Sequence, residues 1–293
     1  MIGKKQGFEK RLSLWRDCFG DTEQYMKFYF EKKAPASDVI EDWEGDKLCS
    51  MAFFTPYDAV FLGEKCVVPY VVGVATRADK RHEGRMTKVL TEGMAHFRGK
   101  KSPLVFLSPA DPAIYKPLGF KETYWKEVFE YTGAGKLSLT VRRWDELSER
   151  RKQEAALFAE SRVESLQRDF HLIHHVSYYN QVHEELKALD GALYVFFEEE
   201  EKIAGVANWI CEDGENEVTE LICAADKGIV VLESLLAVCG GISLKVEDST
   251  FLPKSELKKK GIAVRREKNP YMMYRMLCET CERPLSAYMN DIT

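Results

Sequence analysis

The chain has 293 residues, which suggests two domains, and its 45% hydrophobic and 30% charged residues are typical of a globular protein with ample material for a core. Its formal net charge of −5 argues against nucleic-acid binding, because such proteins need basic surfaces. No apolar stretch reaches the roughly 20 residues of a membrane-spanning helix. We therefore expect no membrane contact, and the eight scattered cysteines are typical of a reduced, cytoplasmic protein.

Residues 8–32 are predicted to form two helices. An apolar stripe runs along the first helix from Phe8 to Cys18, and a turn at Gly20 ends it. Asp21 or Thr22 is expected to cap the second helix, which is unusually aromatic. The simplest interpretation of these aromatic side chains is packing in a core.

Four antiparallel strands are predicted next, as two hairpins. Gly45 and Gly63 lie in the two hairpin turns, and Pro56 falls in an irregular connection between the hairpins. The predicted strands cover residues 40–43, 47–54, 58–62 and 65–68.

The segment from Val71 to Phe97 combines a strand, a basic turn and an amphipathic helix. Its first five residues form a short apolar run that is typical of a buried strand. Apolar residues recur at helical spacing after Gly84. The first amides of a helix lack intrahelical partners and carry partial positive charge, so such an end binds phosphate. The nearby cations that would strengthen the site are Lys80, Arg81 and Arg85.

The spacing of residues 81–86, RHEGRM, resembles the acyl-CoA pyrophosphate loop of the GNAT acetyltransferases, R/Q-x-x-G-x-G/A. Arg81 and Gly84 match this pattern, whereas Met86 stands where the family has a small residue. A larger aliphatic residue there is similar to the two-domain branch that includes the mycobacterial enhanced intracellular survival (Eis) acetyltransferases. A solvated turn before a surface helix is the alternative interpretation of this segment by itself.

A second motif follows a predicted strand at residues 104–107. Tyr115 precedes Gly119 and Phe120 with the spacing Tyr-x-x-x-Gly-Phe. This resembles the segment of GNAT proteins that places a tyrosine beside the thioester sulfur. The alternative is a packing tyrosine with a satisfied hydroxyl. A single strand over residues 122–131 is predicted to follow.

The resemblance implies that the first domain uses acetyl-CoA as its co-substrate and transfers the acetyl group to a primary amine of a small molecule or peptide. Tyr115 would protonate the departing thiolate, since a phenol with a pKa near 10 suits a thiol with a pKa near 8.5. Coenzyme binding is assigned by the resemblance to the backbone around Val72, Gly73, Val74, Arg81, His82, Glu83, Gly84, Arg85 and Met86.

The sequence does not identify the base that accepts the proton of the amine. A lysine-like amine with a pKa of about 10.4 is mostly protonated at pH 7, so the reaction needs a proton acceptor. In the resembled two-domain enzymes the C-terminal carboxylate has this role, which would fall to Thr293 here. A water chain and Asp58 are the alternatives. The aromatic second helix would line the acceptor pocket of that fold.

Residues 132–135, TGAG, are the best linker candidate and divide the chain into domains at 1–131 and 132–293. The predicted order of strands and helices in residues 190–277 repeats that of residues 47–130. We therefore predict an α+β fold with mixed sheets and two GNAT-like domains, the second of them divergent. The second copy has neither motif, so we expect that it does not bind CoA.

No metal site is predicted. His171, His174 and His175 could place two imidazoles on one helical face, but no further ligands complete a tetrahedral site. Cys278 and Cys281 form a lone pair, whereas zinc normally has four ligands.

Three functions are compatible with the sequence. The first is N-acetyl transfer from acetyl-CoA. The second is a catalytically inactive acyl-CoA-binding sensor or scaffold, which Met86 and the unassigned base favour. The third is transfer of an aminoacyl group from tRNA, as in some double-GNAT proteins, and the negative net charge counts against it. The sequence leaves the oligomeric state open, a homo-oligomer included.

Overall fold

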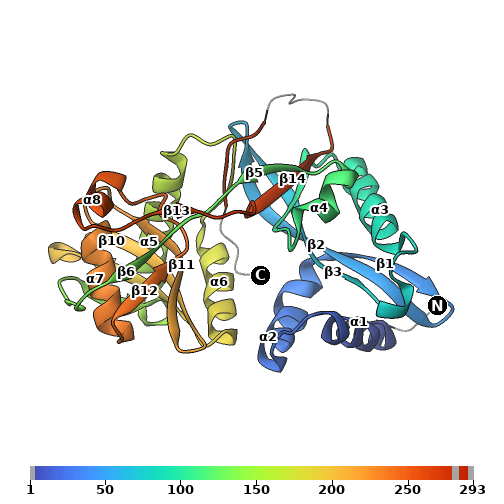
Figure 1. Cartoon of the computed structure of the whole chain (residues 1–293), viewed down its shortest axis with the longest axis horizontal. Helices are drawn as coiled ribbons and strands as arrows, with labels where there is room; N and C mark the ends of the chain where they lie inside the picture. The colour runs from blue at the N-terminus through green and yellow to red at the C-terminus, as the bar shows by residue number, and fades with distance from the viewer. Residues whose placement is uncertain (1–3, 279–283, 290–293) are drawn as a thin grey trace. The chain divides into compact units, whose positions relative to one another are not determined.

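The computed structural model describes residues 4–278 and 284–289 and divides the chain into two compact units. The first unit takes the chain up to Tyr124 and a later segment that begins at Asn269. The second takes Trp125–Lys268 and the chain from Tyr288. Figure 1 labels the elements along the chain. Each unit is built on its own β-sheet.

Within the first unit, the sheet has the order β2-β3-β4-β14-β5, and β1 pairs with β2 off this path. Its strands are β1 (Asp38–Glu44), β2 (Lys47–Phe61), β3 (Glu64–Thr76), β4 (Leu104–Leu107), β5 (Lys121–Tyr124) and β14 (Met272–Met276). The neighbours β3 and β4 are parallel, and the other pairs are antiparallel. A helical crossover therefore joins β3 to β4, as parallel neighbours require.

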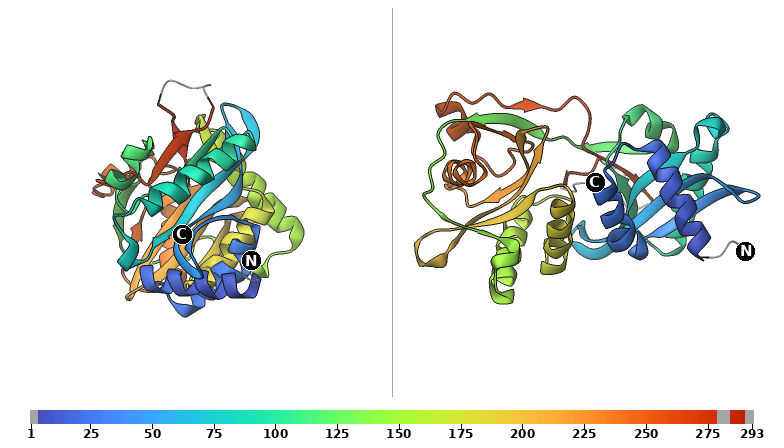
Figure 2. Two further views of the ribbon diagram at one scale, coloured as in Figure 1. Left: turned by 90° about the vertical axis from the view of Figure 1, so that its right-hand side faces the viewer. Right: turned by 90° about the horizontal axis from the view of Figure 1, so that it is seen from below.

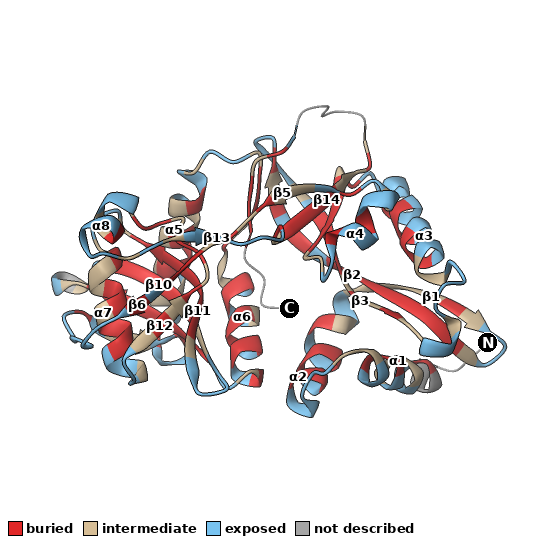
Figure 3. Cartoon of the chain, viewed as in Figure 1, coloured by how far each residue is buried: buried red, intermediate tan, exposed pale blue. Residues whose placement is uncertain are grey.

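Helices cover both faces of this sheet (Figure 1). They are α1 (Lys4–Cys18), α2 (Glu23–Phe28) with a π-helical continuation at Tyr29–Lys33, α3 (Arg85–Gly99) and α4 (Pro112–Tyr115). Successive residues of a strand point to opposite faces, which separates two apolar layers. Phe53 lies edge-on to Trp15 of α1 at 5.8 Å, and Phe54 stacks on Phe97 of α3 at 5.3 Å. Figure 3 shows buried residues along both β2 and β3.

Thr22 caps α2, as one of the two predicted alternatives. Its hydroxyl oxygen accepts a hydrogen bond from the amide of Tyr25 at 3.2 Å. Asp21, the other candidate, instead accepts a hydrogen bond from the indole of Trp15 at 2.6 Å. The aromatic side chains of this region are buried, as the core interpretation predicts.

The two predicted hairpin turns at Gly45 and Gly63 are present, but the predicted break between the hairpins at residues 55–57 is wrong. β2 and β3 are single long strands that stay paired from Ser50 to Phe61 with one register shift. The reason is that Pro56 lies opposite Pro69, so both missing N–H donors fall at one rung of the ladder. A proline within a strand suggests that the strand is interrupted. With the two prolines opposite each other, both strands continue without interruption.

The sheet of the second unit has seven strands in the order β13-β6-β12-β11-β10-β9-β7. They are β6 (Glu127–Thr132), β7 (Thr140–Arg143), β9 (Ala192–Phe197), β10 (Ile203–Glu212), β11 (Glu215–Cys223), β12 (Ser243–Val246) and β13 (Arg265–Arg266). The helices are α5 (Glu149–Glu164), α6 (Val176–Ala188), α7 (Gly228–Cys239) and α8 (Lys254–Lys259). Two further short strands are β8 (Phe170–Leu172) and β15 (Ala287–Tyr288). Figure 2 shows α5 and α6 side by side.

The two sheets follow one scheme, which confirms the prediction that the second half of the chain repeats the fold of the first. In each, an antiparallel meander leads to a parallel neighbour across a helix: β3 and β4 in one unit, β11 and β12 in the other. The next strand is exchanged between the halves of the sequence. β6 follows the first half but pairs with β12, whereas β14 comes from near the C-terminus and lies between β4 and β5.

The predicted single strand over residues 122–131 is therefore wrong. It is two strands in different sheets, because the chain leaves β5 at Tyr124 and re-enters a strand at Glu127. The predicted repeat over residues 190–277 ends in β14, but this strand completes the first sheet rather than the second.

Candidate functional site

The parallel strands β3 and β4 separate soon after they meet. Their register consists of one pair, Tyr70 opposite Phe106. β4 ends one residue later at Leu107, whereas β3 continues to Thr76. The backbone of β3 beyond Tyr70 therefore offers amides and carbonyls to an extended ligand, since β4 no longer pairs with it.

A bulge at Gly73 shapes this opening. Met51 lies opposite Ala75 but Phe53 lies opposite Val72, so β3 has one residue more than β2 at this point. Gly73 has φ 59°, in the left-handed region. A Cβ at this position would come within 2.2 Å of the Trp15 ring. Both observations require glycine here.

The first turn of α3 presents free amides. Its N-cap is Gly84, with φ 76° and ψ 7°, and no side chain caps the helix. Nothing lies within 4 Å of the position that a Cβ of Gly84 would take, so the approach to the backbone is open. A helix of 15 residues with an uncapped N-terminus is suited to binding an anion.

A cavity of about 530 Å³ joins the bulged strand to this helix end. It is lined by Cys18, Phe19, Val74, Ala75, Thr76, Lys80, Arg81, His82, Gly84, Arg85, Met86, Thr87 and Ile114. The structure thus brings six of the predicted residues together around one space. Val72, Gly73 and Glu83 do not line it, although Gly73 sets the course of the strand that does.

Met86, the departure from the family pattern, packs against the apolar cluster under α3. That cluster includes Val89, Leu90 and Phe97 of α3. A side chain anchored in the core does not have to fill the space in front of the first helical amides, so a methionine is compatible with an open helix end.

Two of the three cations expected at the site are paired with carboxylates. Arg85 donates to Glu83 at 2.9 Å, to Asp42 at 2.8 Å and to Glu44 at 3.3 Å. Lys80 lies 2.5 Å from Glu44. Hydrogen bonds to Glu83 and Asp42 raise the pKa of Arg85, and the hydrogen bond from Lys80 lowers the pKa of Glu44.

Arg81 differs from these two cations. Its guanidinium donates to the carbonyl of Thr76 at 3.4 Å, and no described carboxylate lies within ion-pair distance of it. Asp42 and Glu44 were not predicted from the sequence as neighbours of this loop. Their spacing of two residues on β1 places both on one face, but only the register of β1 beside α3 reveals what they meet.

Tyr115 ends α4, whose N-cap Asp111 accepts a hydrogen bond from the amide of Ala113 at 2.9 Å. The side chain is 9% exposed and its ring lies 5.8 Å from that of Phe120, within the apolar cluster under α3. Burial raises the pKa of Tyr115. Its neighbour Ile114 lines the cavity and Tyr115 does not, so its role as an acid stays a prediction.

Of the two named candidates for the base, Asp58 lies in the described part of the chain and does not line the cavity. Asp58 is exposed on β2, opposite Val67. Thr293 lies outside the described residues.

The corresponding place in the second unit is filled. β11 and β12 are paired at Val218 and Val246 and then separate, with a bulge beside Asn208. The start of α7 is packed: a Cβ on Gly228 would come within 2.4 Å of Leu252. The N-terminus of α7 is therefore not accessible in the way that the N-terminus of α3 is at Gly84.

A buried polar cluster lies behind the second bulge instead. The His174 ring has Glu220 at 3.3 Å on one side and Glu160 at 3.5 Å on the other, and its side chain is 0% exposed. Tyr288 donates to Glu220 at 3.1 Å. Burial opposes the charge on His174, but the two neighbouring carboxylates raise its pKa to about 9. Of the histidines considered as metal ligands, His171 and His174 thus lie beside Glu160, whereas His175 accepts a hydrogen bond from the amide of Tyr178.

Within residues 4–278 and 284–289, no three His, Cys, Asp or Glu side chains are placed to hold a metal ion. None of the helices in that part of the chain is long and apolar enough to cross a membrane.

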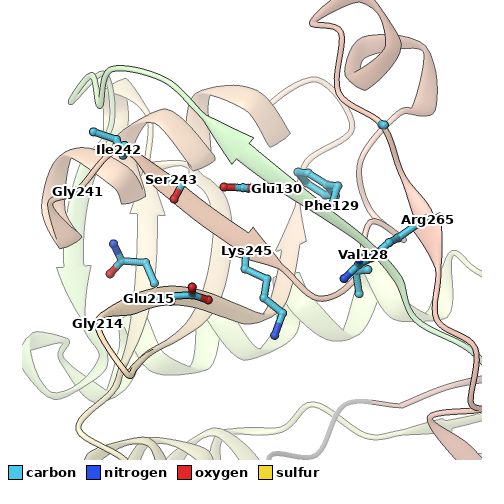
Figure 4. A pocket seen from close by; sticks show the side chains of 12 residues that line it. Val128, Phe129, Glu130, Gly214, Glu215, Gly241, Ile242, Ser243, Lys245 and Arg265 are labelled. Carbon is cyan, nitrogen blue, oxygen red and sulfur yellow. The ribbon is translucent and has the colours of Figure 1, made fainter.

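A second cavity of about 510 Å³ lies on the second unit (Figure 4). It is lined by Val128, Phe129, Glu130, Gly214, Glu215, Asn216, Gly241, Ile242, Ser243, Lys245, Ala263 and Arg265. The polar groups that line it largely form ion pairs and hydrogen bonds within the protein. Lys245 pairs with Glu217 at 2.6 Å, and the Asn216 amide binds both Trp209 and the Gly240 carbonyl. This cavity lacks an uncapped helix end and resembles no part of the first site.

Comparison with known proteins agrees with this geometry. Residues 3–123 match the model of the family described as acetyltransferase (GNAT) domain. No curated protein matches the chain. Among solved structures, a probable N-acyltransferase from Enterococcus faecalis V583 has a TM-score of 0.72 and 17% identity, covering 94% of this chain and 71% of that one.

Two further solved structures share the fold along most of this chain. Eis1 from Mycobacterium abscessus has a TM-score of 0.63 and 10% identity, with coverage of 94% of this chain and 73% of that one. A tandem GNAT protein from the clavulanic acid biosynthesis pathway has a TM-score of 0.58 and 8% identity, with coverage of 96% and 98%. At these identities the likeness concerns the fold. Residues 3–123 thus match a GNAT acetyltransferase domain, and nearly the whole chain shares the fold of these solved structures.

Proposed function

We propose that the first unit transfers an acetyl group from acetyl-CoA to a primary amine of a small molecule or peptide. The observation that carries this proposal is the cavity that connects the unpaired edge of β3 to the uncapped end of α3. An extended pantetheine chain can pair with the strand, while its diphosphate accepts hydrogen bonds from the helix amides.

The residues present fit such a co-substrate. Val74, Ala75 and Met86 supply apolar walls, and Arg81 supplies a cation with no carboxylate partner among the described residues. Backbone amides at the bulge around Gly73 are the proposed donors to the thioester carbonyl, where negative charge develops as the amine attacks. Bound acetyl-CoA supplies the activated acyl group.

The proposed transfer forms one bond and breaks one bond at the thioester carbon. The amine nitrogen attacks the thioester carbon, a C–N bond forms, the C–S bond breaks, and CoA leaves as a thiolate. Tyr115 is the proposed donor of the proton that this thiolate takes up. The amine loses its proton to water, to Asp58 or to the C-terminal carboxylate. A pocket for the amine determines which amine accepts the acetyl group. The residues proposed to bind CoA do not define that pocket.

The second unit, in this proposal, does not bind CoA. The packed start of α7 at Gly228 and the absence of an arginine-containing turn before it support this assignment. The first domain, proposed at residues 1–131, then carries the chemistry, and residues 132–293 provide the divergent partner.

The test is release of free thiol from acetyl-CoA across a library of primary amines, followed by mass spectrometry of the acceptors. A gain of one acetyl group on an amine, at a rate that depends on the protein, is the expected result. Binding of acetyl-CoA without turnover on any amine would favour a sensor. Failure to bind acetyl-CoA would contradict the proposal as a whole.

A further inference from the structure

Carboxylates already form ion pairs with the cations at the edge of the proposed coenzyme site. Glu44 is shared between two of them: it lies 2.5 Å from Lys80 and 3.3 Å from Arg85. Lys80 and Arg85 both line the cavity. An anionic ligand that uses these side chains must therefore compete with Glu44.

The carboxylates around Arg85 differ in how firmly they are held. The Asp42 side chain is 5% exposed and is also bound by Lys88 at 2.6 Å. The Glu44 side chain is 55% exposed, at the end of β1. Asp42 is thus a fixed partner that keeps Arg85 in place, whereas Glu44 can turn into solvent at little cost.

We propose that Glu44 is a displaceable counter-ion that competes with the diphosphate of CoA for Lys80 and Arg85 and thereby sets the affinity of the site. This rests on the proposed function. On binding, the diphosphate takes the place of the Glu44 carboxylate between the two cations, and Glu44 moves into water. The guanidinium of Arg81, which has no carboxylate partner among the described residues, and the α3 amides make contacts that no carboxylate has to vacate.

Two physical reasons favour the exchange. A diphosphate carries more negative charge than one carboxylate, and it accepts hydrogen bonds from the helix end at the same time. The Glu44 side chain is 55% exposed, although those of Lys80 and Arg85 are 19% exposed, and an ion pair whose carboxylate is open to water contributes little to stability. Glu44 therefore weakens CoA binding without blocking it.

The experiment compares the dissociation constant of CoA for the wild-type protein and for Glu44→Gln by isothermal titration calorimetry. At about 50 mM NaCl we expect Glu44→Gln to bind CoA about two- to five-fold more tightly, the factor that an exposed ion pair supplies. At about 1 M NaCl, where the Debye length is about 3 Å, the difference should nearly vanish.

Asp79→Asn is the matched control. Asp79 precedes the same loop and pairs with Lys47 at 2.5 Å and Arg77 at 3.1 Å. The variant removes one negative charge near the site without freeing Lys80 or Arg85, so its affinity for CoA should stay within experimental error. Pantetheine, which lacks the diphosphate, serves as the control ligand and should bind wild type and Glu44→Gln equally.

The outcomes separate the two proposals. If wild type binds CoA and Glu44→Gln binds it no more tightly, the counter-ion proposal is wrong and the proposed function stands. Equal tightening in Asp79→Asn, or tightening towards pantetheine, would also overturn it, because either result reflects a general change of charge. If wild type does not bind CoA, both proposals fail.

Discussion

Two structural constraints act on position 73, and glycine is the only amino acid that satisfies both. Its φ of 59° lies in the left-handed region, and the Trp15 ring stands where a side chain would be. The glycine therefore lets an aromatic core approach the strand that borders the cavity.

We expect Gly73→Ala to lower the free energy of unfolding by about 2 kcal/mol, from strained backbone and a displaced ring. Turnover should fall together with stability, because the bulge orients the strand amides. Urea unfolding and thiol-release assays measure the two effects. Gly45→Ala is a useful comparison: it has φ 61° but open space around it, so it should reveal the share that is due to backbone strain. Equal losses in both variants would contradict the role given to Trp15.

Tyr115 is the second residue with a sharp expectation. If its hydroxyl protonates the leaving thiolate, Tyr115→Phe removes the proton but keeps the ring in its apolar cluster. We expect kcat to fall about 100-fold or more, with little change in the KM for acetyl-CoA. Unchanged turnover would leave Tyr115 as a core residue, in keeping with its 9% exposure.

At the scale of elements, the loop from Arg81 to Met86 could be predicted because the signal is local. Strand, glycine and amphipathic helix lie within one stretch of sequence, and α3 starts at Arg85. The carboxylates Asp42 and Glu44 could not be predicted, since they reach Arg85 from more than forty positions away in the chain. Periodicity gives the face of a strand but not the helix that will lie on it.

The elements of the second unit are joined by His174, which links α5 through Glu160 to β11 through Glu220. Its pKa is about 9, above the ordinary value of about 6.5, so the folded protein holds a proton that the unfolded chain releases. The stabilisation is complete below pH 6.5 and is lost as the pH rises to 9.

We therefore expect the free energy of unfolding to decrease by up to about 3 kcal/mol between pH 6.5 and pH 9. Urea unfolding monitored by circular dichroism measures this, with His174→Gln as the control that should lack most of the slope. A wild-type slope that persists in His174→Gln would place the titration elsewhere.

At the scale of the whole molecule, the repeated order of elements predicted two related folds, and the structure has them. The exchange of β6 and β14 could not be predicted. Both segments are ordinary apolar strands, and an alternating pattern specifies a strand without specifying the sheet that it joins. The glycine-containing linker marks a change in the chain, but the strand just before it already belongs to the second sheet.

A cut at the linker should therefore not yield two independent domains. A fragment of residues 1–131 lacks β14, so β4 and β5 lose the strand that lies between them and expose unpaired edges. We expect this fragment to aggregate or to unfold without a cooperative transition. The same fragment with residues 269–278 joined through a flexible linker should regain solubility, measured by size-exclusion chromatography. A soluble, cooperatively folded 1–131 would contradict the importance of β14.

The placement of β14 also bears on synthesis at the ribosome. The gap between β4 and β5 is filled by a strand that ends at Met276, and roughly 150 residues are translated after Tyr124 before it is complete, which takes about 8 to 30 s at common elongation rates. During that interval the nascent N-terminal half has two open strand edges. We therefore expect coenzyme binding to be acquired only late in translation, and the growing chain to depend on chaperones that shield such edges.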